Sequence, residues 1–418
     1  MSSKWEKEVV KNMNEQVLTG INVLDFGQAI AGPVSARHLG NYGAKVIHVE
    51  SILRPDMTRS NREVSPSIAT NPDFRPTNGH YNTSKYSIML NLKHPRSREV
   101  VEKLIQWADV VNENFSPGTM GRLGLGYEDI CKLKPDIIMV SCSIFGQQGP
   151  YANLGGVDGI ANAASGRTYL TGWPDRSPVT PSAAPYGDMV HPLFVALSVV
   201  AALDYRRRTG KGQYIDASML EVCSHSITPA LLDWQIGNYK IERDGNRIPN
   251  AAPHGVFPCA GEDRWCAIAV FTNEEWENFQ RVIGNPSWAN EVKFSTLKSR
   301  KENEDELEVL VAEWTKTRTA ENVMHMMQEA GVAAGVVQNA RDLIEADPQL
   351  EAREFLVPLK HPVMGEFGHP TPPYKLIKTG AQISTSPCLG EHTYYICTEL
   401  LGITDQEFVE LIQEEVLA

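Results

Sequence analysis

The chain has 418 residues and is acidic, with 39 Lys and Arg against 51 Asp and Glu and a formal net charge of -12. This balance argues against nucleic acid as the main partner, because phosphate-rich polymers favour a basic surface. Hydrophobic residues make up 42% and charged residues 22%, which is typical of a globular protein with two or three domains.

The seven cysteines form no C-x-x-C pair, so we expect no disulfide framework and no structural zinc site. Such cysteine usage favours a cytoplasmic location. The polar N-terminus, residues 1–16, lacks the apolar core of a signal peptide. The longest apolar stretch, residues 190–205, is shorter than the ~20 residues that span a bilayer, so it indicates a core helix and no membrane partner.

Alternating strand and helix patterns predict an α/β fold from residue 21 onward. Residues 21–26 and 44–50 have the length and apolar character of strands, and a helix between them begins near Pro33 and ends near Gly43. Two strands joined by a helix form a βαβ unit, which builds parallel sheets covered by helices. The remaining expected strands are residues 86–92, 109–115, 135–143 and 214–219, and the expected helices are residues 95–108 and the apolar run after Asp188.

The pattern changes near residue 227, where we expect a second, smaller domain. Residues 254–271 predict a hairpin, because two apolar runs flank a turn that contains glycine. Helical patterns follow at residues 273–284, 301–317, 319–331 and 405–418. We therefore expect a large α/β domain over residues 1–226, a small α+β domain over residues 227–346, and a C-terminal segment over residues 347–418.

Asp188 stands out in "PYGDMVHPLF", because it directly precedes a long apolar run. A carboxylate at a helix N-terminus is stabilised by the helix dipole, so capping is the default explanation. The functional alternative is a nucleophile at the edge of an apolar cavity, since carboxylates do form covalent intermediates. On physical grounds alone, capping is favoured.

Two loops can also bind an anion or a nucleotide. The glycines of "FGQAIAGP" (residues 26–33) stand between a strand and a helix, but they match neither the dinucleotide fingerprint nor a P-loop. The spacing favours a tight turn. After the strand at 109–115, Phe115 could stack a base while Asn114 and Arg122 grip phosphates. The alternative there is a Pro-Gly turn with a surface arginine.

Other reactive residues give weaker signals. The eleven histidines form no H-E-x-x-H motif and no pair at helical spacing, so we expect no metal site. His191, three residues after Asp188, fits an ordinary helix residue better than a ligand. Ser165 lacks the G-x-S-x-G elbow of a serine hydrolase, and Cys142 fits a buried small hydrophobe.

Taken together, several stretches resemble the class III CoA-transferase family, which includes formyl-CoA and carnitine CoA-transferases. The resemblance implies an open ring made of a Rossmann-like, CoA-binding large domain and a small domain, with the C-terminal segment returning to the large domain and two rings interlocking in a dimer. The matching stretches follow the family's order and are residues 20–50, 82–95, 108–130, 185–221 and 388–393.

The resemblance places Asp188 on the family's catalytic aspartate. Its carboxylate would attack an acyl-CoA thioester and pass through an aspartyl anhydride and an aspartyl-CoA thioester. CoA and acyl-CoA would be substrates, with no permanently bound cofactor and no metal. The positions that match CoA contacts are Ile30, Ala31, Arg54, Tyr81, Lys85, Asn114, Phe115 and Arg122.

The sequence departs from the family at two basic positions. Some members place Arg where Ser51 stands here, with Arg54 a possible substitute, and some place Lys where Phe145 stands. The small-domain "GGGG" loop of formyl-CoA transferase is also absent, which argues against formyl or oxalate specificity. The substrates expected from the resemblance are aromatic or dicarboxylic acids, of the succinyl-CoA and benzylsuccinate type.

Two other functions remain open at this point. An α-methylacyl-CoA racemase would need a His in a G-H-D stretch, but Val157 stands there, followed by Asp158, and valine cannot abstract a proton. A non-catalytic CoA-binding subunit of a hetero-oligomer is the second alternative, against which the presence of Asp188 argues. The expected partners are acyl-CoA, a carboxylic acid, and a similar chain in a homodimer or heterodimer.

Overall fold

The computed structural model describes residues 16–60, 71–180 and 185–418. Most of the segment in which we expect no signal peptide therefore lies outside the described residues. The chain forms two compact units. The large unit contains residues 1–168, 180–239 and 351–418, and the small unit contains residues 169–179 and 240–350. The longer segment of the small unit begins at Lys240, after α10 (Thr228–Gly237), while the sequence pattern places the start of the small domain near residue 227.

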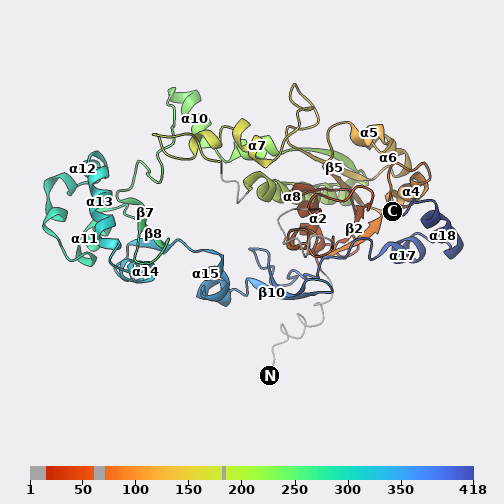
Figure 1. The fold of residues 1–418 in the computed structure, drawn as a ribbon. Helices are drawn as coiled ribbons and strands as arrows, with labels where there is room; N and C mark the ends of the chain where they lie inside the picture. Colours follow the sequence, from red (N-terminus) through yellow and green to blue (C-terminus); the bar gives the residue numbers. More distant parts are fainter. Residues whose placement is uncertain (1–15, 61–70, 181–184) are drawn as a thin grey trace. The chain divides into compact units, whose positions relative to one another are not determined.

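A six-stranded parallel sheet forms the centre of the large unit, as the sequence predicts (Figure 1). The order β3-β2-β1-β4-β5-β6 is that of a doubly wound, Rossmann-like sheet. All five neighbouring pairs are parallel. The strands are β1 (Asn22–Asp25), β2 (Lys45–Glu50), β3 (Lys85–Met89), β4 (Val110–Glu113), β5 (Ile138–Ser143) and β6 (Gln213–Ser218).

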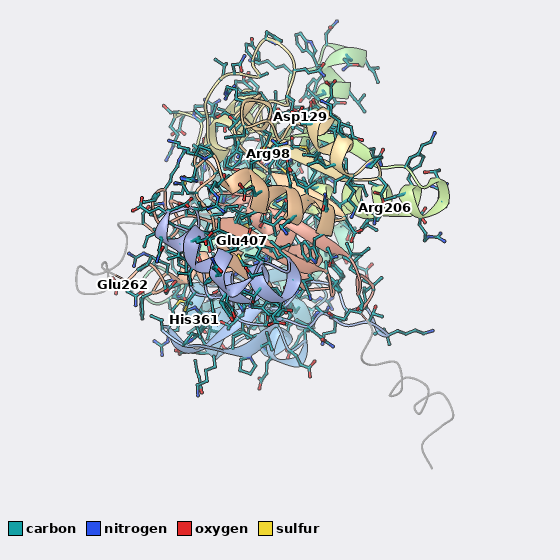
Figure 2. The ribbon with its side chains drawn as sticks, turned by 90° about the vertical axis from the view of Figure 1, so that its right-hand side faces the viewer. Arg98, Asp129, Arg206, Glu262, His361 and Glu407 are labelled. Atoms are coloured by element: carbon teal, nitrogen blue, oxygen red, sulfur yellow. The ribbon has the colours of Figure 1, made fainter. Side chains whose placement is uncertain are left out.

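Alternate residues of these strands point to opposite faces, and each face has its own core. Leu24 and Ile47 pack with α4 (Ser97–Trp107) and with the C-terminal helix α18 (Asp405–Gln413). The view in Figure 2 shows α18, which carries Glu407, beside α4, which carries Arg98. The opposite face packs against α2 (Ala31–Gly40) and α8 (Tyr186–Thr209). Burial on both faces explains why apolar residues occupy the middle of β1, β2 and β5, while polar residues such as Asp25 and Glu113 stand at strand ends.

Helix α8 is buried on one face only. Val195, Val199 and Ala202 pack on the sheet, so the prediction of a core helix is right for this face. Leu197 on another face is 66% exposed. Within the described part of the chain, α8 is also long and apolar enough to cross a membrane by length and composition alone, and a third of its apolar window is buried.

Short helices and a hairpin complete the large unit. The C-terminal segment contains the antiparallel hairpin of β10 (Leu356–His361) and β11 (Gly365–Pro370), and then α17 (Thr393–Tyr395), a π-helical turn (Ile396–Leu400) and α18. The other helices are α3 (Pro76–Tyr81), α5 (Thr119–Arg122), α6 (Tyr127–Leu133), α7 (Asp158–Ala164), α9 (Met219–His225) and α10.

The small unit has an antiparallel sheet of three strands in the order β7-β8-β9. The predicted hairpin is confirmed as β7 (His254–Pro258) and β8 (Trp265–Ala269), with β9 (Ala333–Val336) as the third strand. Its core gathers aromatic and aliphatic side chains from the sheet and the helices. The helices are α11 (Asn273–Val282), α12 (Leu297–Glu302), α13 (Glu304–Thr315), α14 (Ala320–Glu329) and α15 (Ala340–Glu345), and α16 (Pro348–Ala352) crosses the boundary back to the large unit.

Candidate active site

The order of the sheet reverses between β1 and β4, and doubly wound folds bind ligands outside the carboxyl ends of the strands at such a point. The loop from Phe26 to Ile30 and the end of β4 meet there. Asn114 connects them, because its amide nitrogen donates to the Gln28 carbonyl at 2.8 Å and its amide oxygen accepts the Gln28 N–H at 2.7 Å. The loop is therefore held in one conformation by a residue 86 positions away.

The same loop has few N–H groups left for an anion. Ala29 adopts a left-handed backbone conformation with φ of 59°. The N–H groups of Ile30, Ala31 and Gly32 precede the first hydrogen bond of α2, from Val34 N–H to Ile30 C=O, so they are the donors that the loop can offer. The three earlier N–H groups donate to side-chain oxygens: Gly27 N–H to Asp25 at 2.8 Å, Gln28 N–H to Asn114 at 2.7 Å, and Ala29 N–H to Asp56 at 2.6 Å.

Asp25, at the end of β1, is the centre of a fully buried polar cluster. Lys85 Nζ lies 2.7 Å and His48 Nδ1 3.0 Å from its Oδ2, and Asn112 donates to its Oδ1 at 2.8 Å. Burial alone would raise the pKa of Asp25, but Lys85 and His48 lower it below its ordinary value. The Lys85 side chain has no exposed surface. Lys85, expected beside the CoA phosphates, is thus committed to an internal ion pair under the loop.

Asp188 lies in the first turn of α8, in the same unit. The capping role that helix physics predicts for it is wrong, because Pro185 is the N-cap and Asp188 is already inside the helix. Its own backbone N–H is capped from outside, by Asp158 Oδ1 at 3.1 Å. Asp158 is the first residue of α7 and is buried, and its Oδ2 accepts from Asn162 Nδ2 at 2.8 Å.

The surroundings of Asp188 disfavour its charged form. Burial raises the pKa of Asp188 to about 7, and the nearby charge of Asp158 adds to this effect. Asp188 in turn affects two neighbours. Burial raises the pKa of Tyr81, and the charge of Asp188 raises it further. Burial raises the pKa of Cys223 to about 11, and the charges of Asp158 and Asp188 add to this effect. The structure thus brings Tyr81, a predicted CoA contact, close to the predicted nucleophile.

Gly187 keeps this cluster tight. A Cβ at this position would lie 2.7 Å from Asp158 Oδ1 and 2.8 Å from Met219 Cγ. These distances are shorter than ordinary contacts, so the start of α8 can approach α7 this closely only with glycine. Arg167 borders the cluster, since its guanidinium stacks 3.6 Å over the Tyr186 ring and donates to Asn162 Oδ1 at 3.0 Å.

Among the other predicted CoA contacts, Ala31 packs with Met219 and Cys223 near the start of α8, and the remaining ones have local surroundings of their own. Phe115 packs against the core beside β4 and is partly buried. Arg122 is exposed and donates to Thr119 at 2.8 Å, while Arg54 is exposed on the segment after β2. Both arginines are placed as surface cations, and their role toward a phosphate stays a prediction.

The two positions at which the sequence departs from the family have local roles. Ser51 Oγ donates to the carbonyl of Ala418 at 2.6 Å, which ties the C-terminus to the end of β2. The Phe145 ring meets Tyr151 edge-on, with centroids 6.1 Å apart. Neither side chain supplies the missing positive charge.

Glu113, at the end of β4, is a further acid that the sequence did not single out. Burial raises its pKa to about 7, although hydrogen bonds from Ser141 and from the Phe115 N–H oppose the shift. It lines a cavity of about 140 Å³ together with Thr119, Tyr127 and other residues. The sequence pattern around Glu113 gives little indication of this role, because polar residues commonly follow a strand.

His191 and the cysteines fit structural roles. The His191 ring is buried beside the backbone of Ala217, and neither ring nitrogen makes a regular hydrogen bond to a described residue. Burial lowers the pKa of His191 to about 4. Cys142 is buried in β5, as predicted for a small hydrophobe, and burial raises its pKa. Among residues 16–60, 71–180 and 185–418, no group of three or more His, Cys, Asp or Glu side chains could hold a metal ion.

Comparison with known proteins decides the family. The model of CoA-transferase family III matches residues 18–393. The chain belongs to this family. Family III members are enzymes that use CoA thioesters as substrates, so the protein is a CoA-transferase and the resemblance seen in the sequence is confirmed.

Two curated relatives of this CoA-transferase come from Chloroflexus aurantiacus. The chain is 32% identical to succinyl-CoA–D-citramalate CoA-transferase and 33% identical to the beta subunit of succinyl-CoA–L-malate CoA-transferase, in each case over 96% of this chain and 98% of the relative. A solved CAIB/BAIF family protein from Brucella suis is 29% identical and has a TM-score of 0.84, over 93% of this chain and 100% of that chain. The fold is therefore that of a family III CoA-transferase.

Proposed function

We propose that Asp188 is the nucleophile of the CoA-transferase and forms covalent intermediates with both substrates. The observation that carries this proposal is that Asp188 stands at a helix start without a cationic partner among the described residues, so that its carboxylate is unusually basic. Asp188 lies at the start of an apolar helix, and no described cation is near enough to lower its pKa, while burial and Asp158 raise it to about 7. A more basic carboxylate is a better nucleophile, and a site with little water protects an anhydride from hydrolysis.

The proposed reaction has two symmetrical halves. An Asp188 carboxylate oxygen attacks the thioester carbonyl of the donor, the C–S bond breaks, and an aspartyl–acyl anhydride and CoA thiolate form. The thiolate then attacks the aspartyl carbonyl and releases the donor acid as its carboxylate. The acceptor carboxylate attacks the resulting aspartyl-CoA thioester and displaces the thiolate, which finally attacks the acyl carbonyl of the new anhydride and frees Asp188.

Each addition places negative charge on a carbonyl oxygen, so the site needs hydrogen-bond donors. The N–H groups of Ile30, Ala31 and Gly32 are the proposed donors, because earlier N–H groups in the loop are already bound. Removing one such donor typically costs ~3 kcal/mol of transition-state stabilisation. CoA itself is proposed to lie across the β1–β4 edge, with Phe115, Arg122 and Arg54 toward its nucleotide end.

The proposed donor is succinyl-CoA and the proposed acceptor is a dicarboxylic acid. Both Chloroflexus relatives carry succinyl-CoA in their names, together with a hydroxylated dicarboxylic acid. An aromatic dicarboxylic acid such as benzylsuccinate belongs to the same chemical class and stays among the candidates. A panel of unlabelled acids with succinyl-CoA, followed by mass spectrometry of the CoA esters, identifies the acceptor.

Exchange of label tests the proposed reaction. With labelled succinate and succinyl-CoA, the wild-type chain purified alone should move label into the CoA ester, and Asp188→Asn should not. Racemisation of a CoA ester without any acid acceptor is the result expected of a racemase instead. An inactive chain that becomes active only with a second, similar chain would point to a hetero-oligomer.

A dimer is proposed on the exposed apolar surface of the large unit. Leu193, Phe194 and Leu197 of α8 and Trp234 of α10 are 41%, 46%, 66% and 56% exposed. Such large apolar side chains are usually covered in an assembly. The proposed cover is a second copy of this chain in an interlocked dimer, and the subunit name of one relative makes a similar partner chain the alternative. Light scattering of the purified chain, compared with Leu197→Asp, distinguishes a dimer from a monomer.

The proposed location is the cytoplasm. All seven cysteines are unpaired, which suits a reducing compartment.

A further inference from the structure

Asp158 contacts the proposed nucleophile through the main chain. Its Oδ1 accepts the Asp188 N–H at 3.1 Å, and its Oδ2 accepts from Asn162 at 2.8 Å. Asp158 therefore caps α8 from α7, a role that the N-cap Pro185 cannot play because it has no polar side chain. Both oxygens of Asp158 are fixed, so its carboxylate cannot turn away from the start of α8.

The close approach is built into the backbone. Any side chain at Gly187 would meet Asp158 Oδ1 at 2.7 Å and Met219 at 2.8 Å. Asp158 is 7% exposed, so its charge is only weakly screened by water. The start of α8, Gly187 and Asn162 thus hold Asp158 close to Asp188.

We propose that Asp158 is a positioning residue that keeps the Asp188 carboxylate strongly basic, and hence nucleophilic, by fixing the start of α8 and by placing a second negative charge beside it. This inference rests on the proposed role of Asp188. Two carboxylates that share a site do not ionise independently, and the one that keeps its proton to higher pH is the stronger base when it loses it.

The other groups around Asp188 leave Asp158 as the dominant charge. Tyr81 on α3 and Cys223 on α9 both have pKa values raised by burial, and that of Cys223 lies at about 11, so both are neutral near pH 7. Two arginines border the cluster: Arg37 donates to the His80 carbonyl at 2.8 Å, and Arg167 donates to Asn162 Oδ1 at 3.0 Å and stacks over the Tyr186 ring. Burial raises the pKa of Asp188 most, and Asp158 is the charged group that raises it further.

The variant Asp158→Asn removes the charge but keeps an amide oxygen that can accept the Asp188 N–H; its NH2 group loses the hydrogen bond from Asn162, a loss that Asn162→Ala tests by itself. The acid limb of the kcat profile should move at least about one pH unit lower, and the plateau above it should fall about tenfold because the nucleophile is less basic. Asp158→Ala removes the cap as well and should lower the plateau further. Asp129→Asn, a surface change on α6 near Lys132, is the matched control and should leave the profile unchanged.

The outcomes separate the two proposals. An unshifted acid limb in a folded Asp158→Asn protein overturns the inference, even if Asp188→Asn is inactive. An active Asp188→Asn protein overturns the proposed function itself. If Asp158→Asn does not fold by circular dichroism, Asn162→Ala, which loosens Asp158 without removing it, should shift the limb in the same direction by less, and an unshifted limb there also overturns the inference.

Discussion

Two aspartates of the large unit, one fully buried and one partly buried, have opposite environments. Asp25, at the end of β1, is bonded to Lys85, His48 and Asn112, and its pKa lies below the ordinary value. Asp188, at the start of α8, has a carboxylate as its charged neighbour, and its pKa is raised to about 7. A carboxylate that is fully paired stabilises the fold and cannot react. A carboxylate that is left unpaired costs stability and stays available for chemistry.

The comparison predicts that replacing Asp188 lowers activity, whereas replacing Asp25 lowers the stability of the fold. The largest effect should be on turnover: Asp188→Asn should lower kcat by at least about 10⁴-fold, because no other group supplies the covalent intermediate. The measurement is CoA transfer from succinyl-CoA at saturating substrate, with circular dichroism to show that the fold is retained. Turnover within about tenfold of wild type would mean that Asp188 is not the nucleophile.

Asp25→Asn should act on the fold. The change leaves the Lys85 ammonium buried without its negative partner, and breaking a buried ion pair in this way typically costs about 3–5 kcal/mol. Urea unfolding measures the loss. Asp129→Asn, at the surface, should stay within about 0.5 kcal/mol of wild type. If Asp25→Asn lowers the free energy of unfolding by less than about 1 kcal/mol, the ion pair with Lys85 does not stabilise the fold.

The raised pKa of Asp188 makes stability depend on pH in a defined direction. A carboxyl whose pKa rises on folding stabilises the folded state fully below its ordinary pKa of 3.8, and this contribution is lost as the pH rises to about 7. Asp188→Asn lacks this titration, so it should be more stable than wild type at pH 8, by an amount on the order of 1 kcal/mol after screening. Unfolding at pH 5 and pH 8 measures the difference. If the difference in stability between Asp188→Asn and wild type is the same at pH 5 and pH 8, the pKa of Asp188 is not raised by folding.

Arg122 gives the smallest expected effect. Its side chain is exposed and donates only to Thr119 among the described residues, so Arg122→Ala should change stability by less than about 0.5 kcal/mol. If it contacts a CoA phosphate, KM for succinyl-CoA should rise about tenfold, while kcat stays the same. An unchanged KM would leave Arg122 as a surface arginine of a Pro-Gly turn.

Local patterns predicted the fold well. The strands of the parallel sheet, the helix after Asp188 and the hairpin of the small unit all follow from apolar periodicity and turn residues, which act over a few positions. The resemblance to the family predicts that Asp188 is catalytic, and this stays a prediction, whereas helix physics alone favoured a capping role that the structure excludes.

Contacts between distant residues were not predictable in the same way. Lys85 and Asp25 are 60 positions apart, and Asn114 and Gln28 are 86 apart, so no local pattern predicts these hydrogen bonds. Asp158 had one visible signal, since it follows Val157 in the stretch that resembles a racemase motif. Its contact with Asp188, 30 positions away, required the packing of α7 on α8.

The central claim is tested most directly by trapping the covalent intermediate. Wild-type protein is mixed above pH 7 with succinyl-CoA and no acceptor, quenched with hydroxylamine, digested, and analysed by mass spectrometry. The account predicts a hydroxamate on Asp188 that appears only with the CoA ester and is absent from Asp25 in the same sample. An unmodified Asp188 in a preparation that is active once acceptor is added, or a modification on another residue, would contradict it.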